Sequence, residues 1–221
     1  MLTVHHLESS RSQRVLWLLE ELGVPYEIKR YQRDPETLLA PPELAKVHPL
    51  GKSPVITDGD RTIAESGAIL EYIAETYGDG KLIPAMGSPE RARVRYFMHY
   101  AEGSLMPVLV MRLVFARMRV AKVPFFIKPI TRSIANRVDR DFIDPNLARH
   151  VAFLDGELAK STWLAGEELT LADFQMSYPL EALAKRVPNA PKRIIDWVGR
   201  ARARPAYQRA EEKGGPSMMP G

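Results

Sequence analysis

The stretch between residues 48 and 73, HPLGKSPVITDGDRTIAESGAILEYI, constrains the fold of this chain more than any other. It opens with turn residues, and a short apolar strand follows them. The triplet DGD at 58–60 then predicts a tight hairpin turn, because Asp-Gly is typical of such connections. The returning strand leads into Glu65 and Ser66, where a helix with one apolar face begins. This order brings Ser53 and the Glu65–Ser66 pair to one end of a small sheet.

The part of the chain before this stretch has the pattern of two strands and a helix. Residues 2–7 alternate as a short strand does. Residues 11–22 carry apolar side chains at helical spacing, and Gly23 follows as a residue that typically ends a helix. Residues 26–31 predict a second strand, and 35–46 predict a loop with a short helix. The N-terminal part is therefore expected to be a small α/β unit.

The part of the chain after residue 88 has helical periodicity only. Ser88 is followed by a proline and an acid, which is a typical helix start. Pro107 should bend or interrupt the long helix that follows. Residues 122–129 predict a break before a second helical arm at about 131–158, which restarts near Pro145. We therefore expect an all-helical second half that contains helical hairpins.

The remaining helical signals lie near the C-terminus. A buried turn is expected at 163–166. Thr170 with Asp173 three residues later is close to a capping box, with Asp in place of Glu or Gln. Another helix is expected around Ile194, and the last dozen residues, ending GGPSMMPG, are expected to be frayed.

Composition excludes several kinds of site. The chain has no cysteine, so it has no disulfide, no thiolate metal site and no thiol nucleophile of its own. His5 and His6 are adjacent on a predicted strand and face opposite ways, so they cannot chelate one metal. No apolar run is long enough for a membrane span, and no signal peptide is visible. We therefore predict no metal site and a cytoplasmic protein.

The charge of the chain is +4 at pH 7, and basic residues outnumber acidic ones between residues 110 and 150. One interpretation is a solvated helical face. Another is a patch that attracts anionic ligands or a partner. Nucleic-acid binding is not predicted, because no recognition motif or aromatic platform accompanies the charge.

The stretch at 48–73 resembles the glutathione-binding segment of the glutathione transferase superfamily, which has the form P-x-G-x-[VS]-P, a hairpin, then E-S and a helix. The sequences HHLESSRSQRVLWLLEELGVPYEIKRYQRD and APPEL…HPLGKSP are similar to the branch found in bacteria and fungi. The T-x-x-D motif at 170–173 matches the helical domain of that family. The resemblance implies a thioredoxin-like α/β N-terminal domain at 1–78, a linker at 79–87 and an all-α domain at 88–221.

The same resemblance implies a set of residues around glutathione. Ser53, before a cis Pro54, would pair its backbone with the cysteinyl backbone of the ligand. Glu65 would meet the ammonium group, and Ser66 at a helix N-terminus would bind the γ-glutamyl carboxylate. The alternative for this pair is an ordinary helix cap. The glycyl carboxylate has two candidate partners, which are His48 and Lys52.

Activation of the glutathione thiol needs a thiolate stabiliser, because a free thiol with a pKa of ~8.5 is only about 3 % ionised at pH 7. In the family this residue is a Tyr, Ser or Cys at the end of the first strand. The chain has no Tyr before Tyr26 and no Cys, which leaves serine. The S-R-S-Q-R-V alignment favours Ser10, with Arg11 as an electrostatic helper and Ser9 as the alternative. Both serines could instead be helix N-caps.

The electrophile is expected between the two domains, over the start of the helical one. The interpretation as core packing competes with that as pocket lining. The candidate residues are Tyr100, Glu102, Ser104, Leu105, Met106 and Val110.

The resemblance implies an enzyme of detoxification, a homodimeric glutathione transferase that conjugates the thiolate to small hydrophobic electrophiles. Glutathione would be a co-substrate, and no cofactor is implied. A glutathione-dependent peroxidase activity and the identity of the electrophile stay open at this point. The alternative function is a non-catalytic module that binds ligands or proteins. A thiol–disulfide oxidoreductase is excluded by the missing cysteines.

Overall fold

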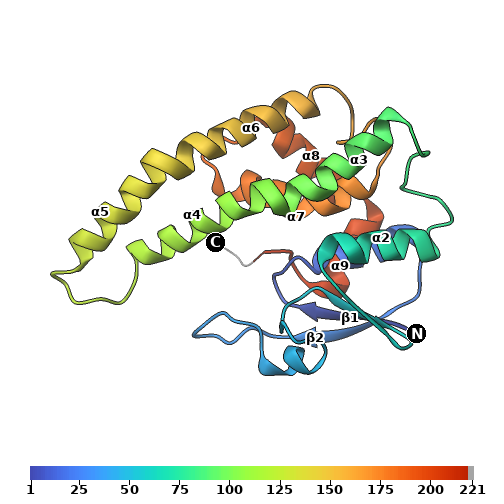
Figure 1. The fold of residues 1–221 in the computed structure, drawn as a ribbon, viewed down its shortest axis with the longest axis horizontal. Helices are drawn as coiled ribbons and strands as arrows, with labels where there is room; N and C mark the ends of the chain where they lie inside the picture. The colour runs from blue at the N-terminus through green and yellow to red at the C-terminus, as the bar shows by residue number, and fades with distance from the viewer. Residues whose placement is uncertain (219–221) are drawn as a thin grey trace.

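The computed structural model describes residues 1–218 and places a small mixed sheet beneath a larger group of helices (Figure 1). The sheet has the strand order β2-β1-β3-β4, with β1 and β2 parallel and the other two pairs antiparallel. The strands are β1 (Leu2–Leu7), β2 (Glu27–Tyr31), β3 (Val55–Asp58) and β4 (Arg61–Ala64). This is the thioredoxin-like arrangement that was predicted for the N-terminal part.

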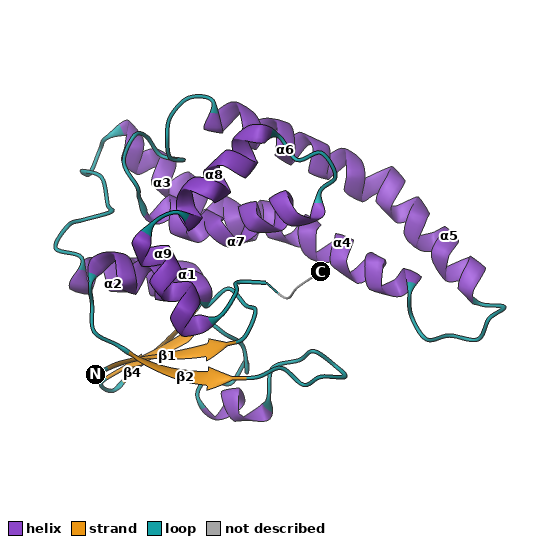
Figure 2. Cartoon of the chain, turned by 180° about the vertical axis from the view of Figure 1, so that it is seen from behind, coloured by secondary structure: helices purple, strands orange, loops and turns teal. Residues whose placement is uncertain are grey.

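The two faces of the sheet are covered differently. Helices α1 (Gln13–Leu22) and α2 (Ser66–Tyr77) lie on one face, and Figure 2 shows them between the sheet and the remaining helices. The short 3-10 helix η1 (Pro42–Lys46) lies on the other face, where Leu44 packs in a small cluster with residues of β1 and β2. Gly23 ends α1 in the left-handed conformation, as the sequence predicted.

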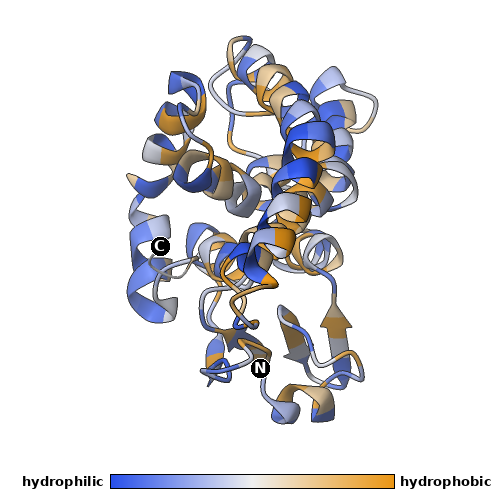
Figure 3. Ribbon diagram, turned by 90° about the vertical axis from the view of Figure 1, so that its left-hand side faces the viewer, coloured by the Kyte–Doolittle hydropathy of each residue, from blue (hydrophilic) through white to orange (hydrophobic). Residues whose placement is uncertain are grey.

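The second half of the described chain is helical. Helices α4 and α5 extend away from the body as a long arm (Figure 1). In the view that faces this arm, both hydrophilic and hydrophobic residues appear along its helices (Figure 3). The helices are α3 (Pro89–Tyr100), α4 (Met106–Arg119), α5 (Lys128–Val138), α6 (Asp144–Leu158), α7 (Leu171–Arg186), α8 (Lys192–Arg202) and α9 (Pro205–Gly214).

Two prolines shape the long helices of the arm. Pro107 and Pro145 each lie near the start of a helix that follows a π-helical turn, η2 (Ala101–Leu105) and η3 (Asp139–Ile143). A proline inside a helix has no N–H and its ring crowds the carbonyl four residues earlier, and a wider π turn relieves both problems. The predicted interruption at Pro107 is therefore a local widening, and the chain stays helical through it.

Predicted helix starts are confirmed by their hydrogen bonds. The Ser88 hydroxyl accepts a hydrogen bond from the Arg91 backbone N–H at 3.1 Å. Thr170 and Asp173 form the capping box of α7. Because Asp173 is buried, its pKa rises to about 6, although it accepts hydrogen bonds from the backbone N–H groups of Leu164 and Thr170.

The prediction of a frayed C-terminal dozen is wrong for the residues that the structure describes. Helix α9 packs along α1, and Ser217 and Met218 are buried. Gly214 lies so close to α1 that an added Cβ would come within 2.4 Å of Leu16 Cδ1 and 2.6 Å of Gln13 Oε1. Residues 219–221 lie outside the described part.

Within residues 1–218, no helix is both long and apolar enough to cross a membrane. The same part of the chain contains no group of three His, Asp or Glu side chains placed to hold a metal ion.

Candidate active site

A cavity of about 210 Å³ lies where the hairpin, α1 and the start of the helical half meet; we call it the hairpin cavity. It gathers all the residues predicted to contact glutathione except Ser10, which does not line it. Its lining residues are Arg11, His48, Leu50, Lys52, Ser53, Pro54, Ala64, Glu65, Ser66 and Glu102.

Ser53 is fixed against the first strand. Its hydroxyl donates to the His5 carbonyl at 3.0 Å and accepts from the Leu7 N–H at 3.2 Å. The Ser53–Pro54 peptide bond is cis, as predicted. The Ser53 hydroxyl is thus occupied by structural hydrogen bonds, while Ser53 also lines the cavity.

Glu65 and Ser66 are not an ordinary capping pair. Glu65 is the N-cap residue of α2, but its side chain makes no capping hydrogen bond, and its backbone has φ = 71° and ψ = 123°. A positive φ is uncommon for a residue with a side chain and is often retained at functional sites. Neither side chain bonds to another residue in the described part of the chain. Both are therefore available to a ligand in the hairpin cavity.

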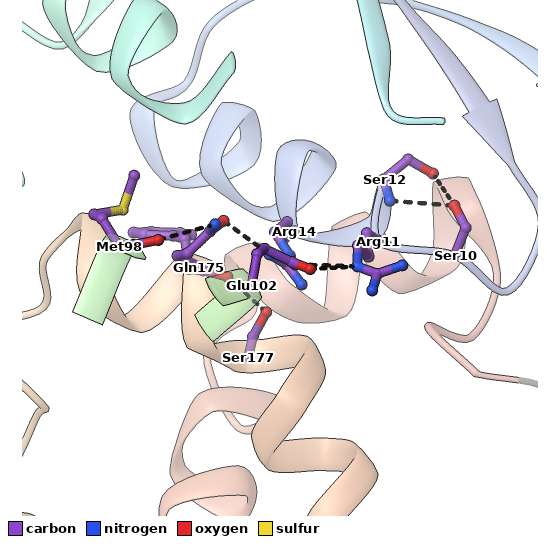
Figure 4. A network of polar contacts seen from close by, with 9 residues as sticks. Ser10, Arg11, Ser12, Arg14, Met98, Glu102, Gln175 and Ser177 are labelled. Atoms are coloured by element: carbon purple, nitrogen blue, oxygen red, sulfur yellow. Dashed lines mark hydrogen bonds and ion pairs between the residues drawn. The ribbon is translucent and has the colours of Figure 1, made fainter. Parts of the chain in front are cut away.

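An ion-pair network joins this cavity to the helical half (Figure 4). Glu102 of η2 accepts hydrogen bonds from Arg11 Nε at 3.0 and 3.1 Å and from Arg14 Nη1 at 3.1 Å. Arg14 also donates to Gln175 Oε1 of α7 at 2.8 Å. Burial lowers the pKa of Arg14 to about 10, and Glu102 opposes that effect. Glu102 therefore compensates a fully buried guanidinium while it borders the cavity.

Ser10 belongs to a hydrogen-bonded chain inside the protein. His6 Nε2 lies 2.8 Å from the Gly214 carbonyl, which can only accept, so Nε2 carries the proton. Burial lowers the pKa of His6, so the ring is neutral at pH 7 and Nδ1 accepts from the Ser12 hydroxyl at 2.8 Å. Ser12 Oγ then accepts from the Ser10 hydroxyl at 2.8 Å. This chain of donors assigns the Ser10 hydroxyl proton to the hydrogen bond with Ser12, which Figure 4 marks with a dashed line.

A second cavity of about 240 Å³ adjoins the first; we call it the α4–α7 cavity. Arg11 borders both cavities, Ser9 borders the second one, and Ser10 lines neither. Met106 and Val110, two of the predicted electrophile-site residues, are here. The lining residues are Ser9, Arg11, Arg33, Leu38, Met106, Leu109, Val110, Leu113, Arg117, Tyr178, Ala182, Arg186 and Met218.

The other four residues predicted for the electrophile site lie elsewhere. Glu102 borders the hairpin cavity. Tyr100 and Ser104 border a separate open hollow on α3 and η2, and the Tyr100 hydroxyl is 2.7 Å from His150 Nδ1. Leu105 is completely buried in the core. The prediction that these four residues line one pocket with Met106 and Val110 is therefore corrected. Successive positions on a helix point to different sides, and the π turn shifts the helix face further.

Sequence reasoning missed most of the α4–α7 cavity. Leu109, Leu113 and Arg117 continue the helix face of Met106 at intervals of three or four residues, so that spacing was an available signal. Tyr178 and Arg186 are eight residues apart and so lie on a similar side of α7. No local sequence pattern indicates that this side of α7 faces α4.

Family models, relatives and a solved structure to which this chain is similar all belong to the same family. The family models described as "Glutathione S-transferase, N-terminal domain" and "Glutathione S-transferase, C-terminal domain" match residues 1–75 and 116–205. Glutathione S-transferase 3 of Schizosaccharomyces pombe is 37 % identical over 96 % of this chain and 88 % of the relative. Glutathione S-transferase 1 of Saccharomyces cerevisiae is 31 % identical over 96 % and 95 %. A crystal structure of a glutathione S-transferase from Actinobacillus pleuropneumoniae superimposes with a TM-score of 0.77 at 30 % identity and covers 97 % of this chain and 93 % of that one.

Proposed function

Because this chain belongs to the glutathione S-transferase family, we propose that its hairpin cavity binds glutathione and its α4–α7 cavity binds the electrophile. The protein is a glutathione transferase. The observation that supports one cavity for each substrate is that Arg11 borders both cavities. A thiol at this boundary would face a molecule in the second cavity while the tripeptide occupies the first.

The hairpin cavity offers polar groups of the kinds that glutathione needs. Glu65 would receive the ammonium group, and the Ser66 hydroxyl with the N-terminus of α2 would bind the γ-glutamyl carboxylate. The backbone of Ser53 would pair with the cysteinyl unit. Lys52 or His48 would meet the glycyl carboxylate. Retention on immobilised glutathione tests this site, and loss of retention in Glu65→Ala would support the assignment of the ammonium group.

Ser10 is our candidate for stabilising the thiolate. Its hydroxyl donates to the neutral Ser12 oxygen, and rotation about the Cβ–Oγ bond would let it donate to a thiolate instead. That exchange replaces a neutral hydrogen bond by a charge-assisted one, which is roughly twice as strong. Arg11 would add its positive charge. Ser9 is the alternative, because it borders the α4–α7 cavity directly.

Conjugation of glutathione to a generic aryl halide tests the activity. Steady turnover supports the proposal, and retention on glutathione without turnover would support the non-catalytic module. That alternative is not favoured, because the named relatives are transferases and Ser10, Ser53, Glu65 and Ser66 are all present. Glutathione-dependent reduction of an organic hydroperoxide is a separate assay for peroxidase activity.

The proposal extends to assembly and location. We expect a two-fold homodimer with the segment 96–110 and the helix near Tyr72 in the contact. Half of the Tyr96 surface is exposed next to the hollow on α3, which leaves room for a partner. Sedimentation that gives only the monomer would contradict this. The domain limits 1–78, 79–87 and 88–221 also stay a proposal, as does a cytoplasmic location, where the glutathione pool keeps thiols reduced.

A further inference from the structure

We propose that the second substrate is an anionic electrophile, a small hydrophobic molecule that carries a carboxylate or a similar anionic group bound by the arginines of the α4–α7 cavity. This inference rests on the proposed function and specifies its substrate class. The observation that carries it is the convergence of four arginines on one small cavity whose other walls are mainly apolar.

The four arginines come from separate parts of the chain. Arg11 precedes α1, Arg33 follows β2, Arg117 lies on α4 and Arg186 lies at the end of α7. Within the described residues, no Asp or Glu lines this cavity. Glu102 pairs with Arg11 from the side of the hairpin cavity, so the charges of the other three are left without a carboxylate at the cavity wall.

Arg33 is held in place without being neutralised. Its guanidinium donates to the backbone carbonyls of Glu8 at 3.2 Å, Leu38 at 3.0 Å and Ser9 at 3.3 Å. Burial lowers the pKa of Arg33, and the positive charges of Arg117 and Arg11 lower it further, while Tyr178 and the Glu8 carboxylate act in the opposite direction. An anion in the cavity would relieve this repulsion and could accept charge-assisted hydrogen bonds from guanidinium groups.

The side chains of Arg117 and Arg186 make no hydrogen bond or ion pair with another residue in the part of the chain that the structure describes. Elsewhere on the arm, Arg112 pairs with Asp144 and Arg119 pairs with Asp139. Two simpler explanations could account for each of these arginines separately. One is a solvated basic helix face, and the other is a favourable interaction between the positive charge and a helix C-terminus. Neither explanation accounts for their position on the same cavity as Arg33.

The remaining lining suits an aromatic or aliphatic body. Met106, Leu109 and Leu113 of α4 face Tyr178 and Ala182 of α7. The Arg11 guanidinium lies 5.4 Å from the centre of the Tyr178 ring. A volume of about 240 Å³ is below the usual range for drug-sized ligands, roughly 300–1,000 Å³, so a one-ring molecule is the expected size.

The experiment compares two electrophiles that differ in charge, para-chloro-meta-nitrobenzoate and its methyl ester. In each reaction the thiolate attacks the ring carbon that bears chlorine, the C–S bond forms, and chloride leaves with the C–Cl bonding pair. Because the ester activates the ring more strongly, each kcat/KM is divided by the uncatalysed rate constant with glutathione in the same buffer. The wild type should then prefer the carboxylate, and added salt should weaken that preference.

Arg117→Gln combined with Arg186→Gln should lower the normalised preference about tenfold, which corresponds to about 1.4 kcal/mol. Arg132→Gln is the matched control, since Arg132 is exposed on α5 and lies outside the cavity. Equal or better normalised turnover of the ester by the wild type would overturn the inference. It would also be overturned if the double variant raised the KM for glutathione instead of changing the preference, because the arginines would then serve the tripeptide. Failure of the proposed function is distinguishable, since neither electrophile would be turned over and glutathione would not retain the protein.

Discussion

Replacement of Ser10 by alanine tests the proposed mechanism most directly. In the structure the Ser10 hydroxyl has one proton, which points to Ser12 Oγ at 2.8 Å, and its oxygen accepts the Ser12 backbone N–H at 3.2 Å. Ser10→Ala removes the only side-chain donor that this residue could offer to a glutathione sulfur. It leaves Ser53, Glu65 and Ser66 in the hairpin cavity, so glutathione affinity should change little.

The size of the effect follows from the thiol pKa. Lowering that pKa from ~8.5 to ~6.5 takes about 2.7 kcal/mol. At pH ~6.5, roughly half of the bound thiol would then be ionised in the wild type and about 1 % in the variant, a ratio of about 50. A thiolate of lower pKa is also a weaker nucleophile, by roughly eightfold for two pKa units. The expected loss in kcat at pH ~6.5 is therefore between about 6-fold and 50-fold.

The assay is the pH dependence of aryl halide conjugation at saturating glutathione. The wild-type rate should level off above pH ~7, whereas the Ser10→Ala rate should rise about tenfold per pH unit until pH ~8.5. The ultraviolet absorbance of the bound thiolate gives the same pKa independently. Ser9→Ala is the matched control. Parallel pH profiles for wild type and Ser10→Ala, with the loss seen in Ser9→Ala, would refute the assignment to Ser10, and no loss in either variant would leave Arg11 or a backbone N–H.

Three further predictions concern stability. Gly214→Ala would force a Cβ toward Leu16 and Gln13 of α1, and overpacking of about 1–3 kcal/mol should lower the calorimetric Tm by about 2–12 °C; an unchanged Tm would contradict the tight contact. Asp173 has a pKa of about 6 in the folded state and a lower one when unfolded, so its stabilising contribution is largest below pH ~4 and falls by ~3 kcal/mol as the pH rises to ~6. Urea unfolding of wild type and Asp173→Asn should show this difference, and identical pH dependence of the two proteins would exclude it. Glu102→Gln leaves the buried Arg14 guanidinium without its carboxylate. Removing one partner of a buried ion pair costs roughly 3–5 kcal/mol, and the loss in chemical unfolding should lie at the lower end of that range because the Glu102 side chain is 32 % exposed. Glu90→Gln, which removes a carboxylate outside the network, should show no such loss.

The secondary structure and the hairpin cavity could largely be predicted from the sequence. The strand 2–7, the Asp-Gly hairpin, the helix end at Gly23 and the Thr170–Asp173 cap depend on interactions between residues a few positions apart. The same holds for the cavity, because Lys52, Ser53, Glu65 and Ser66 are separated only by one hairpin. Turn geometry places the two ends of such a hairpin together without help from the rest of the fold.

Tertiary packing alone decided which residues form the second cavity and what the C-terminal residues do. Arg33, Arg117 and Arg186 are far apart in sequence, and they meet only because α4 and α7 pack with particular faces toward each other. Leu105 points into the core, although Met106 borders the cavity, since each helical position turns the side chain to a new side. His6 Nε2 donates a hydrogen bond to the Gly214 carbonyl, although the two residues lie near opposite ends of the sequence. Local propensity specifies the elements, but the phase of one helix against another depends on long-range packing that no local pattern records.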